Sequence, residues 1–218
     1  MMARRLEAIP SSLMTRTRWV AIVGISLILA GGVAGMLFKE VSAARTGVPL
    51  PVYGRVPPFQ LVDHHGRPIS QEDLRGQAWI AGFIFTRCAG QCPMMSAAMA
   101  QLARQFRNHG SVRVVSFTVD PEWDTPKVLS DYASRYAGPS DPWLFVTGDK
   151  DRLARLCQEG FRLAAAESTE NLQEPITHSV RLVLVDQQGT IRGYYDATDP
   201  AALTRLRTAM QNLLNNPS

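Results

Sequence analysis

Hydrophobic residues form two long uninterrupted runs, and the first of them lies near the N-terminus. Trp19–Phe38 holds twenty residues without a charge, which at about 1.5 Å per residue is enough to cross a hydrocarbon core of about 30 Å. Four arginines precede this run, whereas Lys39 and Arg45 are the only basic residues close behind it. The bias in positive charge predicts one transmembrane helix at 19–38 with residues 1–18 in the cytoplasm.

A cleaved signal peptide is the alternative to this anchor. Val41-Ser42-Ala43 fits a small-residue cleavage site, but the apolar run exceeds the usual signal-peptide core of about 7 to 15 residues. We therefore expect an anchor, followed by a small, polar, proline-bounded linker at 39–52 and a domain at 53–218 outside the cytoplasm.

The second apolar run, Trp79–Phe85, is continuous rather than alternating, which is typical of a central strand covered on both faces. After it, Met95, Met99, Leu102 and Phe106 fall at helical spacing and predict a helix from about Pro93 to Asn108. Further elements are expected as a hairpin at 57–69, strands at 112–119 and 143–146, helices capped by Asp124 and Asp149, a hairpin at 180–195 and a last helix from Asp199.

The order of these elements, ββαβαβαββα, predicts an α/β fold: a thioredoxin-like three-layer sandwich with a central mixed sheet, preceded by the transmembrane helix. Residues 164–175 have no hydrophobic period and are expected to form an exposed loop. Composition agrees with one globular domain, because 45% of the 218 residues are hydrophobic and 19% are charged. The net charge of +4 is concentrated in the N-terminal arginines, so no nucleic-acid partner is expected.

The chain has only three cysteines, too few for a disulfide-stapled scaffold, and this points to a redox or metal role. Cys88 and Cys92 lie where the central strand gives way to a helix, whose N-terminal amides favour thiolate. A structural disulfide, a redox pair and a pair of metal ligands all fit this spacing. Cys157 falls on an apolar helical face and is expected to be a buried core residue.

The presence of a third metal ligand would separate a metal site from a disulfide or a redox pair. His178 lies at the start of the final hairpin, which in a thioredoxin-like fold comes opposite the cysteine loop. Two thiolates and one imidazole suit Cu(I) better than Zn(II), which prefers a fourth ligand, although a lone histidine before a strand is more often an ordinary residue. Met94 remains a candidate ligand, and the adjacent His64 and His65 are expected to form a solvated turn.

From about Pro57 to Met210 the chain resembles the Sco/SenC family of membrane-tethered, thioredoxin-like copper proteins. The matching motifs are GFIFTRC with the CxxxCP spacing at Cys88 and Cys92, SFTVDPEWDTP at 116–126 and THSVRLVLVDQQG at 177–189. The resemblance implies a copper ion bound by Cys88, Cys92 and His178, with Asp120 near the site. The sequence departs from the family pattern at 89–91, Thr177 and Trp123. These differences affect the surroundings of the site more than its ligands.

The resemblance also implies a function, namely a non-enzymatic copper chaperone that delivers copper to the copper A site of cytochrome c oxidase. The alternative is a thiol-disulfide oxidoreductase that keeps the cysteines of that site, or of another extracytoplasmic partner, reduced. The expected partner is the copper A subunit or another copper or thiol carrier. We expect a single-pass protein of the bacterial inner membrane, with a periplasmic domain that is a monomer or weak dimer.

Overall fold

The computed structural model describes residues 49–163, 165–167, 176–178 and 180–216, with the backbone alone described at 165–167 and 176–178. The predicted cytoplasmic N-terminus, the transmembrane helix at 19–38 and all but the last four residues of the linker lie outside this range. Within it, none of the helices combines the length and the apolar character needed to span a membrane.

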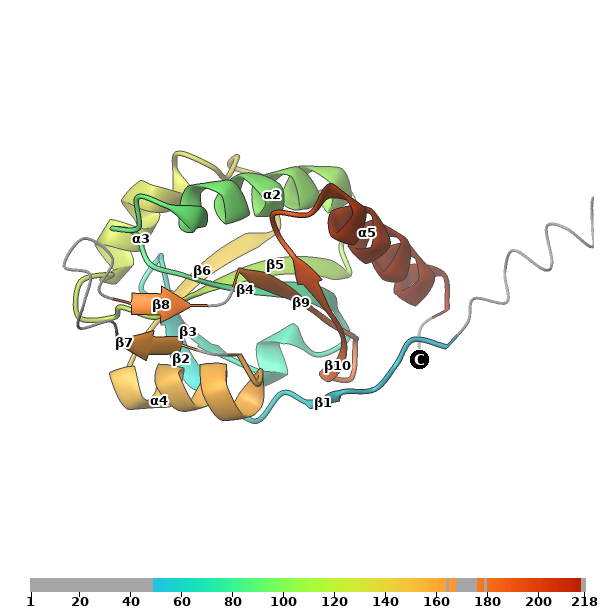
Figure 1. Cartoon of the computed structure of the whole chain (residues 1–218), viewed down its shortest axis with the longest axis horizontal. Helices are drawn as coiled ribbons and strands as arrows, with labels where there is room; N and C mark the ends of the chain where they lie inside the picture. The colour runs from blue at the N-terminus through green and yellow to red at the C-terminus, as the bar shows by residue number, and fades with distance from the viewer. Residues whose placement is uncertain (1–48, 164, 168–175, 179, 217–218) are drawn as a thin grey trace, which may run out of the picture. The chain divides into compact units, whose positions relative to one another are not determined.

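A mixed eight-stranded sheet forms the centre of the domain, as predicted (Figure 1). Its strands run in the spatial order β1 (Gly54–Arg55), β10 (Thr190–Asp196), β9 (Arg181–Val185), β4 (Ala78–Ile84), β5 (Val112–Thr118), β6 (Trp143–Thr147), β2 (Gln60–Asp63) and β3 (Pro68–Ser70). β4, β5 and β6 are parallel, and β9 pairs with β4 antiparallel. Every residue of β4 is buried, which explains its continuous apolar sequence.

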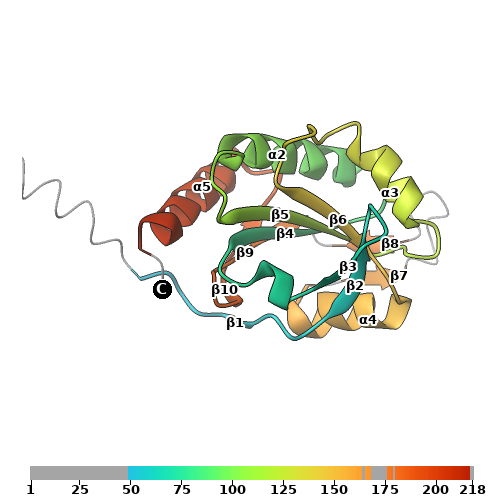
Figure 2. The same cartoon turned by 180° about the vertical axis from the view of Figure 1, so that it is seen from behind.

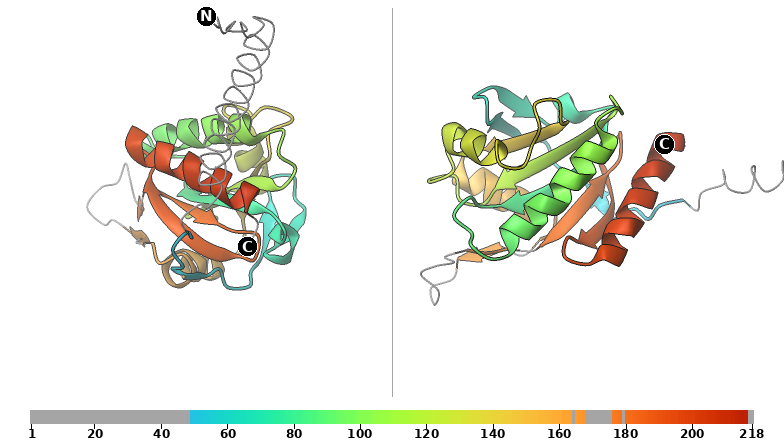
Figure 3. Two further views of the ribbon diagram at one scale, coloured as in Figure 1. Left: turned by 90° about the vertical axis from the view of Figure 1, so that its right-hand side faces the viewer. Right: turned by 90° about the horizontal axis from the view of Figure 1, so that it is seen from above.

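Helices cover both faces of the sheet and complete the predicted three layers (Figures 1 and 2). One face carries α2 (Gln91–Phe106), α3 (Pro126–Ala133) and α5 (Pro200–Asn215), which pack with one side of the sheet into a core cluster. The other face carries the 3₁₀ turn η1 (Glu72–Leu74), α4 (Lys150–Arg155) and the π-helical turn η2 (Leu156–Gly160). Seen from above, α2 and α5 lie over the sheet (Figure 3).

A buried side chain of α2 packs directly against the backbone of the central strand at Gly82. A Cβ atom placed on Gly82 of β4 would lie 2.8 Å from Met99 Sδ and 3.0 Å from Met99 Cε. Met99 itself is fully buried. The absence of a side chain at Gly82 therefore makes room for the Met99 side chain.

Three predictions of secondary structure differ from the structure. The helix α2 begins at Gln91 rather than near Pro93, although Pro93 does fall in its first turn. The cap of α3 is Thr125, whose side chain accepts from Val128 N, and not Asp124. Ala165–Glu167 forms strand β7, which pairs with β8 (Ile176–His178) in a separate two-stranded sheet, so the segment at 164–175 is not loop throughout.

The predicted hairpin at 57–69 is confirmed as β2 and β3, with Gly66 at φ 77° in its turn. The expectation of a solvated turn holds for His65, which is exposed, but not for His64. His64 is half-buried against Phe145, and its Nδ1 accepts a hydrogen bond from the backbone N–H of Phe145 at 3.3 Å. Burial lowers the pKa of His64, so this ring joins the hairpin to β6 as a neutral side chain.

Candidate metal centre

The two clustered cysteines meet at the junction of β4 and α2. Cys88 is half-buried in the connecting loop, and Cys92 is fully buried in the first turn of the helix. The backbone N–H of Cys92 donates to Cys88 Sγ at 3.4 Å, and no disulfide joins the two residues. The loop thus brings a partly exposed cysteine and a buried cysteine together, which is the arrangement expected of a redox pair or a pair of soft metal ligands.

The end of α2 beside these thiols carries no compensating negative charge. Its N-cap residue, Gly90, makes no side-chain capping bond, and the first turn holds no acidic residue. No acidic side chain of the first turn therefore offsets the partial positive charge of the helix N-terminus beside the two thiols.

Asp120, predicted to lie near the site, is joined to the cysteine loop through an arginine. Its Oδ2 accepts hydrogen bonds from Arg87 Nε at 3.1 Å and from Arg87 Nη2 at 2.6 Å. The Arg87 guanidinium also lies 4.7 Å from the ring centroid of Trp123, a side chain that is 52% exposed. Asp120 therefore positions Arg87, the residue before Cys88, and Arg87 in turn holds an exposed aromatic ring at the edge of the site.

Asp124 is a site residue that sequence reasoning missed, because its position before Thr125-Pro126 looked like a helix cap. The carboxylate is fully buried and accepts hydrogen bonds from both the backbone N–H and the hydroxyl of Thr86. It also accepts one from the Thr118 hydroxyl at the end of β5. Asp124 thus ties the start of the cysteine loop to the neighbouring strand.

Burial raises the pKa of Asp124, and the hydrogen bonds from Thr118 and Thr86 oppose that effect only in part. The same buried region holds the hydrogen bond between Ser96 and Tyr132, 2.8 Å long, one turn after Cys92. Burial also raises the pKa of Tyr132. The Asp124 carboxyl and the Ser96–Tyr132 hydroxyls on the sheltered side of the site therefore make their hydrogen bonds within the protein.

The third predicted ligand, His178, ends strand β8, where its backbone pairs with Ala165. Its side chain lies outside the described residues. Since β9 runs antiparallel to β4, with Val183 opposite Ala81, the segment before β9 comes to the end of β4 from which the cysteine loop emerges. Figures 1 and 3 likewise draw β8 at the end of the sheet where α2 begins. The ligand role of His178 stays a prediction.

Among the side chains that the structure describes, no group of three or more His, Cys, Asp or Glu residues is placed to hold a metal ion. The two thiols therefore account for the described part of the candidate centre. Met94 in the first turn of α2 is 54% exposed, and its ligand role also stays a prediction. Cys157 is buried on the far side of the sheet, where burial raises the pKa of its thiol to about 12, as expected of an inert core cysteine.

Comparison with known proteins gives one family. The SCO1/SenC family model matches residues 53–212. The SCO1 protein homolog of Bacillus subtilis is 31% identical over 175 residues, which cover 79% of this chain and 90% of that protein. A Stutzerimonas stutzeri protein named for copper binding is 32% identical over 170 residues, covering 77% of this chain and 80% of that protein.

Solved structures agree with the sequence comparison. A SCO1/SenC family lipoprotein from Bacillus anthracis has a TM-score of 0.70 and 27% identity, covering 77% of this chain and 99% of that one. The structure of BsSco, described with a disulfide switch and as a member of the Sco family of cytochrome c oxidase assembly proteins, has a TM-score of 0.66 and 27% identity, covering 78% and 100%. The extent of the family match and the shared fold lead to one conclusion: the chain belongs to the SCO1/SenC family.

Proposed function

We propose that this protein is a copper carrier that supplies the copper A site of cytochrome c oxidase and holds the ion through Cys88, Cys92 and His178. The observation that carries the proposal is that two cysteines not joined by a disulfide meet at a helix N-terminus whose first turn holds no acidic residue. Thiolate sulfur and imidazole nitrogen are donors that suit copper, and a set of two sulfurs and one nitrogen suits Cu(I) in particular. The relatives named for copper binding and for cytochrome c oxidase assembly support the same proposal.

The differing exposure of the two sulfurs suggests an order of events. Cys88 reaches solvent, whereas Cys92 is buried, so an incoming carrier meets Cys88 first. Exchange then proceeds by ligand replacement, in which a donor atom of the partner takes the place of a protein sulfur and no electrons move. The proposal includes a membrane anchor formed by the helix at 19–38 and a domain in the periplasm. It also includes the copper A subunit as the partner and a monomeric or weakly dimeric state.

A second candidate function is thiol-disulfide exchange, which the disulfide switch of BsSco favours. In that reaction the Cys88 thiolate attacks a partner disulfide and releases one partner thiolate, giving a mixed disulfide. Cys92 then attacks Cys88 Sγ, which releases the second partner thiolate and leaves a Cys88–Cys92 disulfide. The partner gains the two electrons that the protein loses.

Substitution of His178 separates the two functions. We expect His178→Ala to bind Cu(I) much more weakly, because one of three ligands is lost, while its rate of reaction with a model disulfide stays unchanged. Cu(I) affinity is measured under anaerobic conditions by competition with a chromophoric chelator, and exchange is measured with 5,5′-dithiobis(2-nitrobenzoate). His65→Ala, which removes an exposed histidine elsewhere, is the matched control. An unchanged Cu(I) affinity in His178→Ala would contradict the proposed ligand set.

A further inference from the structure

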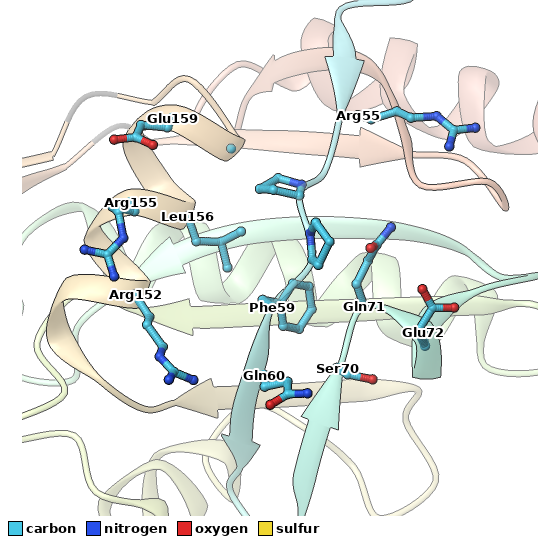
Figure 4. Close-up of a pocket in the computed structure, with 13 residues that line it drawn as sticks. Arg55, Phe59, Gln60, Ser70, Gln71, Glu72, Arg152, Arg155, Leu156 and Glu159 are labelled. Carbon is cyan, nitrogen blue, oxygen red and sulfur yellow. The ribbon is translucent and has the colours of Figure 1, made fainter.

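A groove of about 700 Å³ lies on the α4 side of the sheet, whereas α2 and the cysteine loop lie on the other side (Figure 4). Its volume falls in the range of about 300 to 1,000 Å³ that is usual for ligand sites. The segment from Pro57 to Gln60 runs through it, with α4 and η2 on one side and Ser70, Gln71 and Glu72 on the other. The groove is therefore separate from the candidate metal centre.

The floor of the groove is apolar and fixed by packing. Phe59 is half-buried and packs edge-on against Phe117, with ring centroids 5.6 Å apart. Leu156 is 4% exposed and points toward Phe59. At Gly160 a Cβ atom would lie 2.9 Å from the Pro57 ring, so η2 is packed tightly against the floor. This surface is already formed and needs little ordering to bind a ligand.

The groove carries an excess of positive charge. Arg152 and Arg155 lie one turn apart on α4, and Arg55 lies on β1 at the opposite side, with its side chain extending away from Phe59 (Figure 4). Within the described part of the chain, none of these three guanidinium groups has an ion-pair partner. Two acidic residues line the groove, Glu72 and Glu159. Glu72 is paired with Arg75 at 2.7 Å, so Glu159 is the acidic lining residue whose charge opposes the arginines.

The positions of these charges select the kind of ligand. The arginines lie on two sides of an apolar floor rather than around one point (Figure 4), so they match several separate carboxylates better than a single phosphate. Guanidinium groups pair with carboxylates through two parallel hydrogen bonds. The amides of Gln60 and Gln71 also line the groove and offer both donors and acceptors to a peptide backbone.

We propose that this groove binds an acidic peptide segment of a partner protein, with carboxylates on the arginines and an apolar side chain between them over Phe59 and Leu156. The site lies across the sheet from Cys88 and Cys92. A partner held there leaves the thiols accessible, so the groove is a docking site that acts beside the proposed copper exchange and does not depend on it.

The test uses the full-length, metal-free chain in a non-ionic detergent and a fluorescein-labelled peptide, Glu-Asp-Leu-Glu-Asp, followed by fluorescence anisotropy. We expect saturable binding that weakens with salt, and no binding of the neutral peptide Gln-Asn-Leu-Gln-Asn. Arg152→Ala/Arg155→Ala should weaken binding about tenfold, which corresponds to about 1.4 kcal/mol. Arg55→Ala, on the opposite side of the groove, should weaken it as well and serves as the independent test if the double variant unfolds.

The matched control is Arg104→Ala/Arg207→Ala, which removes the same charge from α2 and α5. This control should bind the acidic peptide as the unchanged protein does. An equal loss of affinity in the control would mean general attraction to a basic protein and would overturn the proposal. It would also be overturned if both peptides bound alike, if no groove variant lost affinity, or if phosphatidylglycerol vesicles bound in an arginine-dependent manner while the peptide did not.

Discussion

Removal of the Asp124 carboxylate should cost far more stability than removal of a surface carboxylate from the adjoining helix. Asp124 is fully buried and accepts hydrogen bonds from three donors: the Thr86 backbone N–H, the Thr86 hydroxyl and the Thr118 hydroxyl. Asp124→Ala leaves these donors without an acceptor. A buried donor without a partner costs about 1 to 3 kcal/mol, and the two hydroxyls can rotate toward other acceptors whereas the Thr86 amide cannot, so we expect a loss of about 2 to 4 kcal/mol.

The measurement is urea unfolding of the reduced protein, monitored by circular dichroism. Asp131→Ala is the control, because Asp131 is an exposed residue of α3 that pairs with Lys127 at 3.0 Å, an interaction that contributes less than about 1 kcal/mol. Asp124→Ala should also weaken Cu(I) binding, since the loop before Cys88 loses its attachment to β5. If Asp124→Ala and Asp131→Ala lost the same free energy of unfolding, Asp124 would not be the tether of the cysteine loop.

The pKa of Asp124 gives a second, independent test of its environment. Because burial raises this pKa above the ordinary 3.8, the folded protein binds more protons than the unfolded chain between 3.8 and the folded pKa. The contribution of Asp124 to stability therefore decreases as pH rises through that window. Asp124→Asn should remove this slope, and an identical pH profile of unfolding in the two proteins would contradict the raised pKa.

Two further predictions concern packing and charge elsewhere in the domain. Gly82→Ala should cost about 1 to 3 kcal/mol in urea unfolding, because the new methyl group meets the buried Met99 side chain. Gly110→Ala, where a new Cβ would have no atom within 4 Å, should cost almost nothing. Equal losses would refute the tight packing of Met99 against Gly82. Burial raises the pKa of Asp63, but hydrogen bonds from Arg67 and the neighbouring backbone outweigh it, so that this pKa is lowered. Its contribution is present above the ordinary 3.8 and lost as pH falls through the folded pKa, so the difference in unfolding free energy between Asp63→Asn and the unchanged protein should shrink on acidification; a constant difference would refute this explanation.

The parts of the fold that follow from local pattern could be predicted from the sequence. The continuous apolar residues of β4 mark a strand buried on both faces, and Met95, Met99, Leu102 and Phe106 mark the buried face of α2. Each of these signals is contained in a single element. The mixed sheet and its three layers follow from the order of such elements.

The contacts that position the site could not be predicted in this way, because they join residues far apart in the chain. Thr86 and Asp124 are 38 positions apart, and Arg87 and Asp120 are 33 apart. An aspartate before Thr-Pro also fits a helix cap equally well, and only the tertiary fold turns Asp124 toward the cysteine loop. Strand β7 was missed because its three residues, Ala165–Glu167, are too few to show a period of two.

The central claim, that Cys88 and Cys92 bind copper when both are reduced, is tested most directly by an anaerobic copper titration of the full-length protein. Absorption is followed in the region of thiolate-to-copper charge transfer. We expect a band that saturates at one copper per protein, is absent from the protein oxidised to the Cys88–Cys92 disulfide and is lost in Cys88→Ser, while Cys157→Ser retains it. A reduced protein that gives no band and binds no copper would contradict the copper-carrier account and leave thiol-disulfide exchange as the function.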